Sequence, residues 1–286
     1  MSTTPLVSVV MPAYNAERFL ADAVGSVLGQ TWKRLELVIV DDGSVDGTPE
    51  LARQFAAEDS RVRVIHRANG GVSAARNAGI AEASGELLCF LDADDAFLPD
   101  KLERQVGFLD FFRSCDLVYS DHYVGDERLN PLRLECRSPP PLPLQKLLTF
   151  CNWFAPMSPL MRSRLVRQVG GFDEDLRSAE DWDCWLRVSH HGVLAYLPGP
   201  VGVYRTHPGQ MHKDLERMLE NQEKVIRKHF QPGSEEWRLA HAAMAWSDAK
   251  RSRASRNYAR MTFKLLGCAW HARTRRDLRN ILAFAY

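Results

Sequence analysis

The 286-residue sequence lacks most of the short motifs that identify nucleotide-binding and hydrolytic proteins. It has no G-x-x-x-x-G-K-[ST] phosphate loop, and no G-x-G-x-x-G follows its first apolar run, which argues against a dinucleotide-binding domain. It also has no G-x-S-x-G nucleophile elbow and no H-E-x-x-H pair. Phosphate binding by this chain therefore cannot depend on a glycine-rich loop.

Four further absences limit where the protein works and what it binds. No stretch approaches the ~20 apolar residues of a membrane-spanning helix, and the first residues lack the layout of a signal peptide. The six cysteines show no C-x-x-C spacing, as is typical of free thiols in a reducing compartment. The formal net charge is +1, so no global field favours nucleic acid. We expect a cytoplasmic protein with no nucleic-acid partner.

What the sequence does contain is an alternation of apolar runs with helical patterns. We expect strands at residues 7–11, 35–40, 62–66, 86–91 and 117–119. Helical spacing of apolar residues separates these runs, and Asn15 is suited to cap the first helix. Strands that alternate with helices of ten to fifteen residues indicate βαβ units and a largely parallel sheet.

Polar residues follow several of the expected strands at the point where each strand ends. Asp41 and Asp42 end the second strand, and Asp92, Asp94 and Asp95 end the fourth. Ligands of open α/β sheets bind outside the carboxyl ends of the strands. Neighbouring carboxylates repel one another unless solvent or a cation intervenes, and a hard divalent ion that bridges a phosphate fits this chemistry. The alternative for the last three acids is a solvated turn.

The second half of the chain is less regular. Residues 125–143 are charged and then proline-rich, which predicts an irregular excursion or flap. A helix with Trp182 and Trp185 at packing spacing follows, and core packing is favoured over sugar stacking for both. From Met211 onward the pattern is helical and mostly polar. Residues 247–286 carry a local charge of +8, which leaves −7 for the rest of the chain.

Six sequence blocks together resemble the inverting glycosyltransferases of the family 2 type, which have the GT-A nucleotide-sugar fold. In chain order they are Val-Val-Met-Pro-Ala-Tyr-Asn (9–15), Val-Asp-Asp-Gly-Ser with Asp-Gly-Thr (40–48), Ala-Arg-Asn-Ala-Gly (75–79), Leu-Asp-Ala-Asp-Asp (91–95), Gly-Phe-Asp-Glu leading to Glu-Asp (171–181), and Tyr-Arg-Thr-His (204–207). Each block alone is weak, but their order and spacing over residues 6 to 209 are specific.

The resemblance implies an α/β fold of the GT-A type, with a mixed, mainly parallel sheet flanked by helices and a C-terminal helical extension. It places the catalytic domain at residues 1–210, with a nucleotide-binding half at about 1–120 and an acceptor-side half at about 121–210. Residues 211–286 would form the basic helical extension.

The resemblance also assigns expected roles to individual residues. Donor-binding residues would be Pro12, Tyr14, Asn15, Asp41, Asp42, Arg76, Asp92 and Asp95. Asp42 is favoured over Asp41 for contact with the nucleotide base, and Asp41 is as well suited to cap a turn. Asp92 would reach the ribose, Arg76 would lie near the nucleotide or its phosphates, and Asp95 could join either the ribose or the metal.

The metal and catalytic residues follow from the same resemblance. Asp94 and His207 would hold Mn²⁺ or Mg²⁺, which offsets the charge on the leaving nucleoside diphosphate. Asp181 would be the general base that takes the proton of the acceptor hydroxyl, and its neighbour Glu180 could serve instead.

The implied activity is metal-dependent inverting transfer of a sugar from a nucleotide-sugar donor, with UDP-sugars as the default, to a hydroxyl of a glycan or lipid-linked acceptor. A role in cell-envelope polysaccharide synthesis would follow. The alternative is a catalytically silent nucleotide-sugar-binding module or assembly partner. The basic C-terminal helices suit peripheral binding to an anionic membrane at its inner face, or simple packing on the catalytic domain.

Overall fold

The computed structural model describes residues 4–139, 143–209 and 215–254. Its strands are β1 (Val7–Ala13), β2 (Leu35–Asp41), β3 (Val62–His66), β4 (Leu87–Phe90), β5 (Ala96–Phe97), β6 (Leu117–Gly125), β7 (Pro131–Glu135), β8 (Leu160–Arg162) and β9 (Leu194–Arg205). Its helices are α1 (Leu20–Leu28), α2 (Thr48–Glu58), α3 (Val72–Glu82), α4 (Lys101–Phe111), α5 (Leu144–Phe150), α6 (Ser163–Gln168), α7 (Glu180–Ser189), α8 (Leu215–His229) and α9 (Glu235–Ala254).

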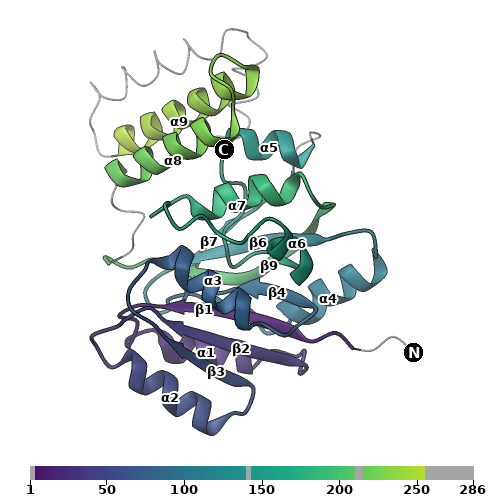
Figure 1. Ribbon diagram of the computed structural model, residues 1–286, viewed down its shortest axis with the longest axis vertical. Helices are drawn as coiled ribbons and strands as arrows, with labels where there is room; N and C mark the ends of the chain where they lie inside the picture. Colours follow the sequence, from purple (N-terminus) through teal and green to yellow (C-terminus); the bar gives the residue numbers. More distant parts are fainter. Residues whose placement is uncertain (1–3, 140–142, 210–214, 255–286) are drawn as a thin grey trace.

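The strands join in one mixed sheet with helices on both faces (Figure 1). The strand order is β3-β2-β1-β4-β8-β6-β9-β5, and β7 pairs with β6 outside this path. Strands β3, β2, β1 and β4 run parallel to one another, and β6 runs parallel to β9. Strand β8 is antiparallel to both β4 and β6, β5 is antiparallel to β9, and β7 is antiparallel to β6. The mixed, mainly parallel α/β sheet predicted from the sequence is confirmed.

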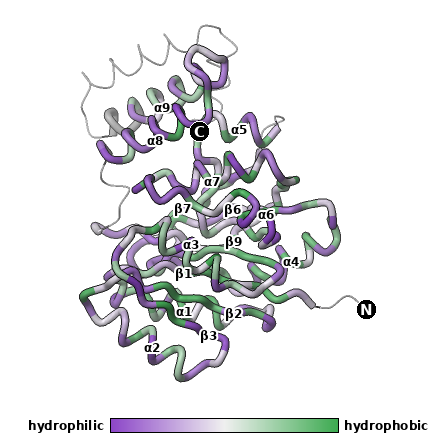
Figure 2. The backbone as a smooth tube through the Cα atoms, in the orientation of Figure 1, coloured by the Kyte–Doolittle hydropathy of each residue, from purple (hydrophilic) through white to green (hydrophobic). Residues whose placement is uncertain are grey.

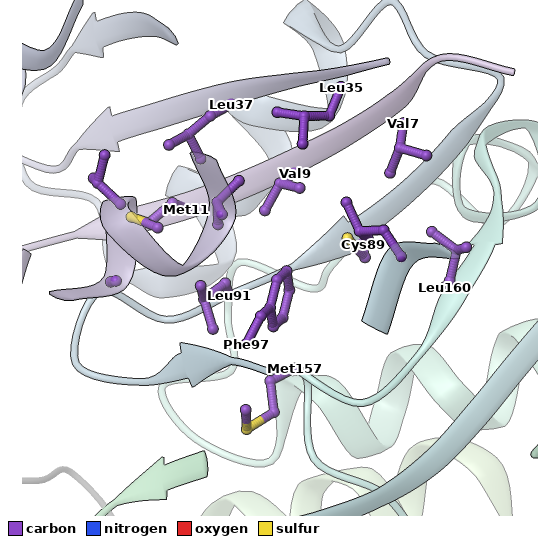
Figure 3. Packing of buried hydrophobic residues seen from close by; sticks show 14 of the residues in the cluster. Val7, Val9, Met11, Leu35, Leu37, Cys89, Leu91, Phe97, Met157 and Leu160 are labelled. Carbon is purple, nitrogen blue, oxygen red and sulfur yellow. The ribbon is translucent and has the colours of Figure 1, made fainter. Parts of the chain in front are cut away.

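Strand β1 shows why the apolar runs become buried strands. Successive side chains of a strand point to opposite faces, so a fully apolar strand needs cover on both sides. Val9 and Met11 pack with residues of α1 and α4 on one face, where Leu37 of β2 joins them (Figure 3). Val10 points to the other face and packs with Ile80 of α3. Figure 2 shows the hydrophobic character of β1 and β2 against the more hydrophilic outer helices.

The segment 125–143 is more regular than the sequence predicts. Residues Pro131–Glu135 form β7, whose backbone pairs with β6 from His122 to Gly125. The prediction of an irregular excursion is wrong for these residues. Strand β6 pairs with β8 only at Leu117 and Val118, so its later residues offer an edge that satisfies the backbone of this charged segment. Leu132 and Leu134 remain largely exposed on this edge strand.

Helices α8 and α9 pack against α7 and α5 at the end of the molecule away from β3 (Figure 1). Val225 and Ile226 of α8 are fully buried in the same apolar cluster as Trp185 of α7. Leu239 and Ala242 of α9 pack on Phe150 of α5. Trp182 and Trp185 are both buried, which confirms the prediction that they pack in the core.

A buried carboxylate fastens α8 to α7. The side chain of Asp183 is fully buried and lies 2.6 Å from Arg187 Nη2, 2.8 Å from His229 Nε2 and 2.8 Å from Lys228 Nζ. Burial alone would raise the pKa of Asp183, but the hydrogen bonds from His229 and Lys228 and the charge of Arg187 hold it well below its ordinary value. This cluster ties the C-terminal helices to the helix that carries the candidate base.

The boundary predicted at residue 210 stays a prediction, as does the peripheral membrane role of the C-terminal segment. Most of the basic segment, residues 255–286, lies outside the described residues. Among the helices that are described, none has both the length and the apolar character needed to cross a membrane.

Replacing Asp183 with Asn should lower the free energy of unfolding at pH 7 by about 3 kcal/mol, the usual cost of breaking a buried ion pair. The pKa of Asp183 is lowered on folding, so its stabilisation is present above the unfolded value of about 4 and is lost as the pH falls below it. Urea denaturation of the natural protein and of Asp183→Asn should therefore show a difference in unfolding free energy that becomes smaller as the pH is lowered from 7 to below 4.

Asp173→Asn is the matched control, because Asp173 binds the same Lys228 Nζ, at 2.6 Å, from a more exposed position. That substitution should cost no more than about 1 kcal/mol. Equal losses from the two substitutions would contradict a special role for the buried cluster.

Candidate active site

The carboxyl ends of β1, β2 and β4 meet at one edge of the sheet because the three strands are parallel and in register. This edge therefore gathers most of the residues predicted to bind the donor. Pro12 is buried within β1, whereas Tyr14, which follows the strand, is 53% exposed. The placement agrees with the rule that ligands of α/β sheets bind beyond the strand ends.

Asn15 does not cap the first helix, so that prediction is wrong. Helix α1 begins at Leu20, and Asn15 adopts a left-handed conformation with a φ of 49°. Its side-chain Oδ1 accepts a hydrogen bond from Val45 N at 2.9 Å, and its backbone N donates to Ser44 Oγ at 2.9 Å. Asn15 therefore joins the loop after β1 to the loop after β2.

Both acids at the end of β2 are buried and hold the surrounding loops. Asp41 accepts a hydrogen bond from Ser44 N at 3.1 Å. Asp42 accepts hydrogen bonds from Gly70 N, at 3.1 Å, and Gly71 N, at 2.7 Å, in the turn before α3. The turn-capping role considered for Asp41 is thus filled by both residues. Contact of Asp42 with a nucleotide base stays a prediction.

The three acids after β4 occupy different environments. The side chains of Asp92 and Asp94 are each 28% exposed, whereas Asp95 is buried and accepts a hydrogen bond from Arg205 N at 2.9 Å. Burial, and then the charges of Asp94 and Asp92, raise the pKa of Asp95 well above its ordinary value. Asp95 therefore anchors β9, and Asp92 and Asp94 remain open to a ligand.

Asp94 and His207 form the pair expected to hold a metal ion. Asp94 Oδ2 lies 2.9 Å from His207 Nε2. Burial raises the pKa of Asp94, and the charge of Asp92 adds to this effect. Within the described residues no three His, Cys, Asp or Glu side chains form a complete metal site. Two protein ligands suit Mg²⁺ or Mn²⁺, which commonly takes its other ligands from substrate phosphates and water, so the residues fit the ion.

His207 is positioned by its neighbours on β9 and α1. The ring of Phe19 lies 4.6 Å from the ring of His207 and 4.6 Å from the guanidinium carbon of Arg205. Arg205 is buried and pairs with Asp22 of α1 at 2.9 Å. The arginine of the Tyr-Arg-x-His block, Arg205, thus helps to hold His207 beside Asp94 through the ring of Phe19 that both residues contact.

Arg76 connects the two sides of the site. It is 1% exposed, and its guanidinium lies 2.8 Å from Asp92 Oδ1 and 2.6 Å from Glu180 Oε1. Burial lowers the pKa of Arg76, but Asp92 and Glu180 outweigh burial and raise it above its ordinary value. This arrangement excludes a surface role for Arg76 and places its charge beside Asp92, with the ring of Phe172 5.1 Å away.

Helix α3 is itself fixed closely enough to hold Arg76 in place. Asn77 pairs with the backbone of Phe172, donating from Nδ2 to its O at 2.9 Å and accepting from its N at 2.8 Å. Gly79 lies so close to Val10 of β1 that an added Cβ would clash with it. The Arg-Asn-Ala-Gly block and the Gly-Phe-Asp block of the sequence thus meet through these contacts.

Asp181 lies near the start of α7 and is 8% exposed. Asn152 Nδ2 donates to its Oδ2 at 2.5 Å, and Trp182 N donates to its Oδ1 at 2.8 Å. Burial, with a contribution from the charge of Glu180, raises the pKa of Asp181 to about 7. Glu180 is bound to Arg76, which leaves Asp181 as the better candidate for a base near neutral pH.

Two residues at the site were missed by sequence reasoning. Burial, and then the charges of Asp95, Asp92, Asp94 and Asp181, raise the pKa of the Tyr204 hydroxyl. Tyr204 therefore lies within electrostatic range of both the acidic strand end and the candidate base, and its place in the Tyr-Arg-x-His block was an available signal. Asn152 lies in a segment without a motif, and no sequence signal identified it.

Comparison with known proteins identifies the family of the chain. The family model described as Glycosyl transferase family 2 matches residues 8–161. EpsE of Bacillus subtilis (strain 168), which is named as a glycosyltransferase, is 35% identical over 201 residues, 68% of this chain and 71% of EpsE. TuaG of the same organism, named as a glycosyltransferase of teichuronic acid biosynthesis, is 34% identical over 194 residues, 67% of this chain and 75% of TuaG.

Solved structures resemble the fold at low sequence identity. The mannosyltransferase PcManGT from Pyrobaculum calidifontis, solved with GDP-Man and Mn²⁺, matches with a TM-score of 0.66 at 19% identity over 94% of this chain and 87% of that one. Residues 1–349 of S. aureus TarS, solved with UDP-GlcNAc, match with a TM-score of 0.63 at 20% identity over 84% of this chain and 70% of that one. Because the family model covers more than half of the sequence and relatives above 30% identity align over about two thirds of it, this chain belongs to glycosyltransferase family 2.

Proposed function

We propose that this protein is a metal-dependent inverting glycosyltransferase of the hexosyltransferase type. It would move a sugar from a nucleotide-sugar donor, with UDP-sugars as the default, to a hydroxyl of a glycan or lipid-linked acceptor. The observation that carries the proposal is that two carboxylates of the site have different partners. Asp94 pairs with His207 and keeps 28% of its side chain exposed, whereas Asp181 is 8% exposed and accepts hydrogen bonds from Asn152 and from Trp182 N. Inverting transfer needs one group for the diphosphate and another for the acceptor proton.

On the donor side, Asp94 and His207 would hold Mn²⁺ or Mg²⁺, which supplies positive charge to the departing diphosphate. Asp92 would accept a hydrogen bond from the ribose, with Arg76 holding its carboxylate in place at 2.8 Å. The exposed ring of Tyr14 and the loops held by Asn15, Asp41 and Asp42 would flank the base. The match of these residues to the strand ends supports the arrangement.

On the acceptor side, the Asp181 carboxylate would take the proton of the acceptor hydroxyl as its oxygen attacks the anomeric carbon. The bond from that carbon to the diphosphate oxygen breaks at the same time, and the nucleoside diphosphate leaves with the electron pair. Each carboxylate oxygen of Asp181 has two lone pairs and accepts one hydrogen bond, Oδ1 from Trp182 N and Oδ2 from Asn152 Nδ2, so a lone pair remains for the proton. A pKa of about 7 matches a base that works at neutral pH.

The name of the relative TuaG supports an acceptor in cell-envelope polysaccharide synthesis. The competing proposal is a silent nucleotide-sugar-binding module. Asp181 favours the enzyme, because a binding module gains nothing from a buried carboxylate whose pKa burial has raised.

Asp94→Asn should remove the metal dependence of nucleotide binding, because it leaves His207 as the only other proposed ligand. Isothermal titration with UDP and with GDP, each with Mn²⁺ or with a chelator, should show binding by the natural protein that Mn²⁺ tightens about tenfold or more. Asp110→Asn, at a position on α4 with a 60% exposed side chain, is the control and should behave like the natural protein. Unchanged metal dependence in Asp94→Asn would refute the metal assignment.

Asp181→Asn should leave donor binding intact and lower transfer by about 10²-fold to 10⁴-fold, the usual contribution of a general base. In the natural protein the rate should rise with pH to a midpoint near 7, because the raised pKa keeps Asp181 protonated and inactive below that value. Nucleotide release is measured from pH 5 to 9 with the nucleotide sugar that binds in a metal-dependent way.

Asp175→Asn, a change of the same type at an exposed position, is the control for this experiment. A fully active Asp181→Asn protein would rule out Asp181 as the base. Tight donor binding with no turnover at any pH would favour the silent module.

A further inference from the structure

The candidate base is held at both of its oxygens. Trp182 N binds Asp181 Oδ1 at 2.8 Å, and Asn152 Nδ2 binds Oδ2 at 2.5 Å. The first contact belongs to the backbone at the start of α7 and is present whatever the side chain at residue 182. The second depends on one side chain from another part of the chain. Both contacts restrict rotation of the carboxyl group about its Cβ–Cγ bond, and Asn152 supplies the one that a side-chain substitution can remove.

Asn152 is supplied by a segment that is fastened to α7 along its length. Gln145 Nε2 of α5 donates to Ser189 O at 2.7 Å near one end of α7, and Trp182 Nε1 donates to Leu148 O at 2.7 Å near the other. Asn152 lies two residues after the end of α5, so the segment that leaves this helix reaches the base. The reverse face of α5 is covered by α9, where Phe150 packs on Leu239.

The amide of Asn152 is not otherwise satisfied. Its Oδ1 is buried and has no hydrogen-bond partner among the described residues. A buried amide oxygen without a partner costs about 1–3 kcal/mol, and such groups in native proteins call for an explanation beyond packing. Within the described part of the chain, the hydrogen bond of this side chain is the one to Asp181.

We propose that Asn152 is a positioning residue for the general base: its amide N–H fixes the Asp181 carboxyl group and favours the carboxylate over the protonated form, so that a free lone pair is presented to the acceptor hydroxyl. The inference rests on the proposed function, because it assigns Asn152 a purpose only if Asp181 is the base. An N–H donor stabilises the charged form of a carboxylate, which is the form a base needs.

The other groups that act on Asp181 come from three elements. Glu180 of α7 raises its pKa and Arg76 of α3 lowers it, after the larger effect of burial. Burial is the main cause that raises the pKa of Cys184 of α7 and of Tyr204 of β9, and the charge of Asp181 adds a smaller contribution to each. Asn152 is an uncharged neighbour of Asp181. Replacing it removes one hydrogen bond to the Asp181 carboxyl group and changes no charge.

The test is direct titration of Asp181 in full-length protein labelled with ¹³C at the side-chain carboxyl of Asp. The Asp181 resonance is assigned by its disappearance in Asp181→Asn. We expect a midpoint near 7 in the natural protein and a midpoint about one pH unit higher in Asn152→Ala, because the stabilising donor is lost. The isosteric Asn152→Asp should move it upward further, since a second carboxylate then faces the first.

Asn221→Ala is the matched control. Asn221 is also buried, but its side chain binds Arg177 N and Arg217 O and does not contact Asp181. Its loss should lower stability and leave the Asp181 midpoint unchanged. A midpoint that moves equally in Asn221→Ala and Asn152→Ala would show a general structural effect and overturn the inference.

The pH dependence of nucleotide release completes the test. The midpoint of the rise in rate on the acid side should move to higher pH in Asn152→Ala. It should move by the same number of pH units as the titration midpoint of the Asp181 carboxyl resonance. An unchanged titration midpoint of Asp181 in Asn152→Ala would overturn the role of Asn152. If the alanine variant does not fold, an unchanged midpoint in Asn152→Asp would do the same. Full activity of Asp181→Asn would instead reject the proposed function, so the two failures are separated.

Discussion

The arrangement of the site depends on one buried guanidinium. Arg76 is removed from solvent and binds Asp92 on the donor side and Glu180 on the acceptor side. Burial of an unpaired cation is costly, and losing one partner of a buried pair costs about 3–5 kcal/mol, so both acids must remain beside it. Because Asp181 follows Glu180 directly, this constraint also sets how far the candidate base lies from the acidic end of β4.

Helices α8 and α9 pack on the two helices, α7 and α5, that lie next to the candidate base. Asp183 binds His229 and Lys228 of α8, and Phe150 of α5 packs on α9. The segment that follows α5 contacts the start of α7 where Asn152 binds Asp181. The described part of the extension is therefore joined to the acceptor side of the site by a buried ion cluster and an apolar cluster, whatever the basic segment beyond it does.

Much of the site could be predicted because parallel strands bring sequence-distant turns to one edge. Asp94 and His207 are 113 residues apart, and their blocks led to a pair that lies 2.9 Å apart. Asn15 was misread because its side chain binds Val45, a tertiary contact that local capping preference cannot reveal. Asn152 was missed because its significance lies in a neighbour 29 residues away and in no local pattern.

We propose that Asp181 and the diphosphate site act from opposite faces of the donor sugar in a single displacement. The anomeric configuration of the product tests this, when it is followed by ¹H NMR from the earliest time points with an α-linked nucleotide sugar. We expect a β-linked product to form first. An α-linked product at the earliest time points would contradict direct displacement and the role given to Asp181.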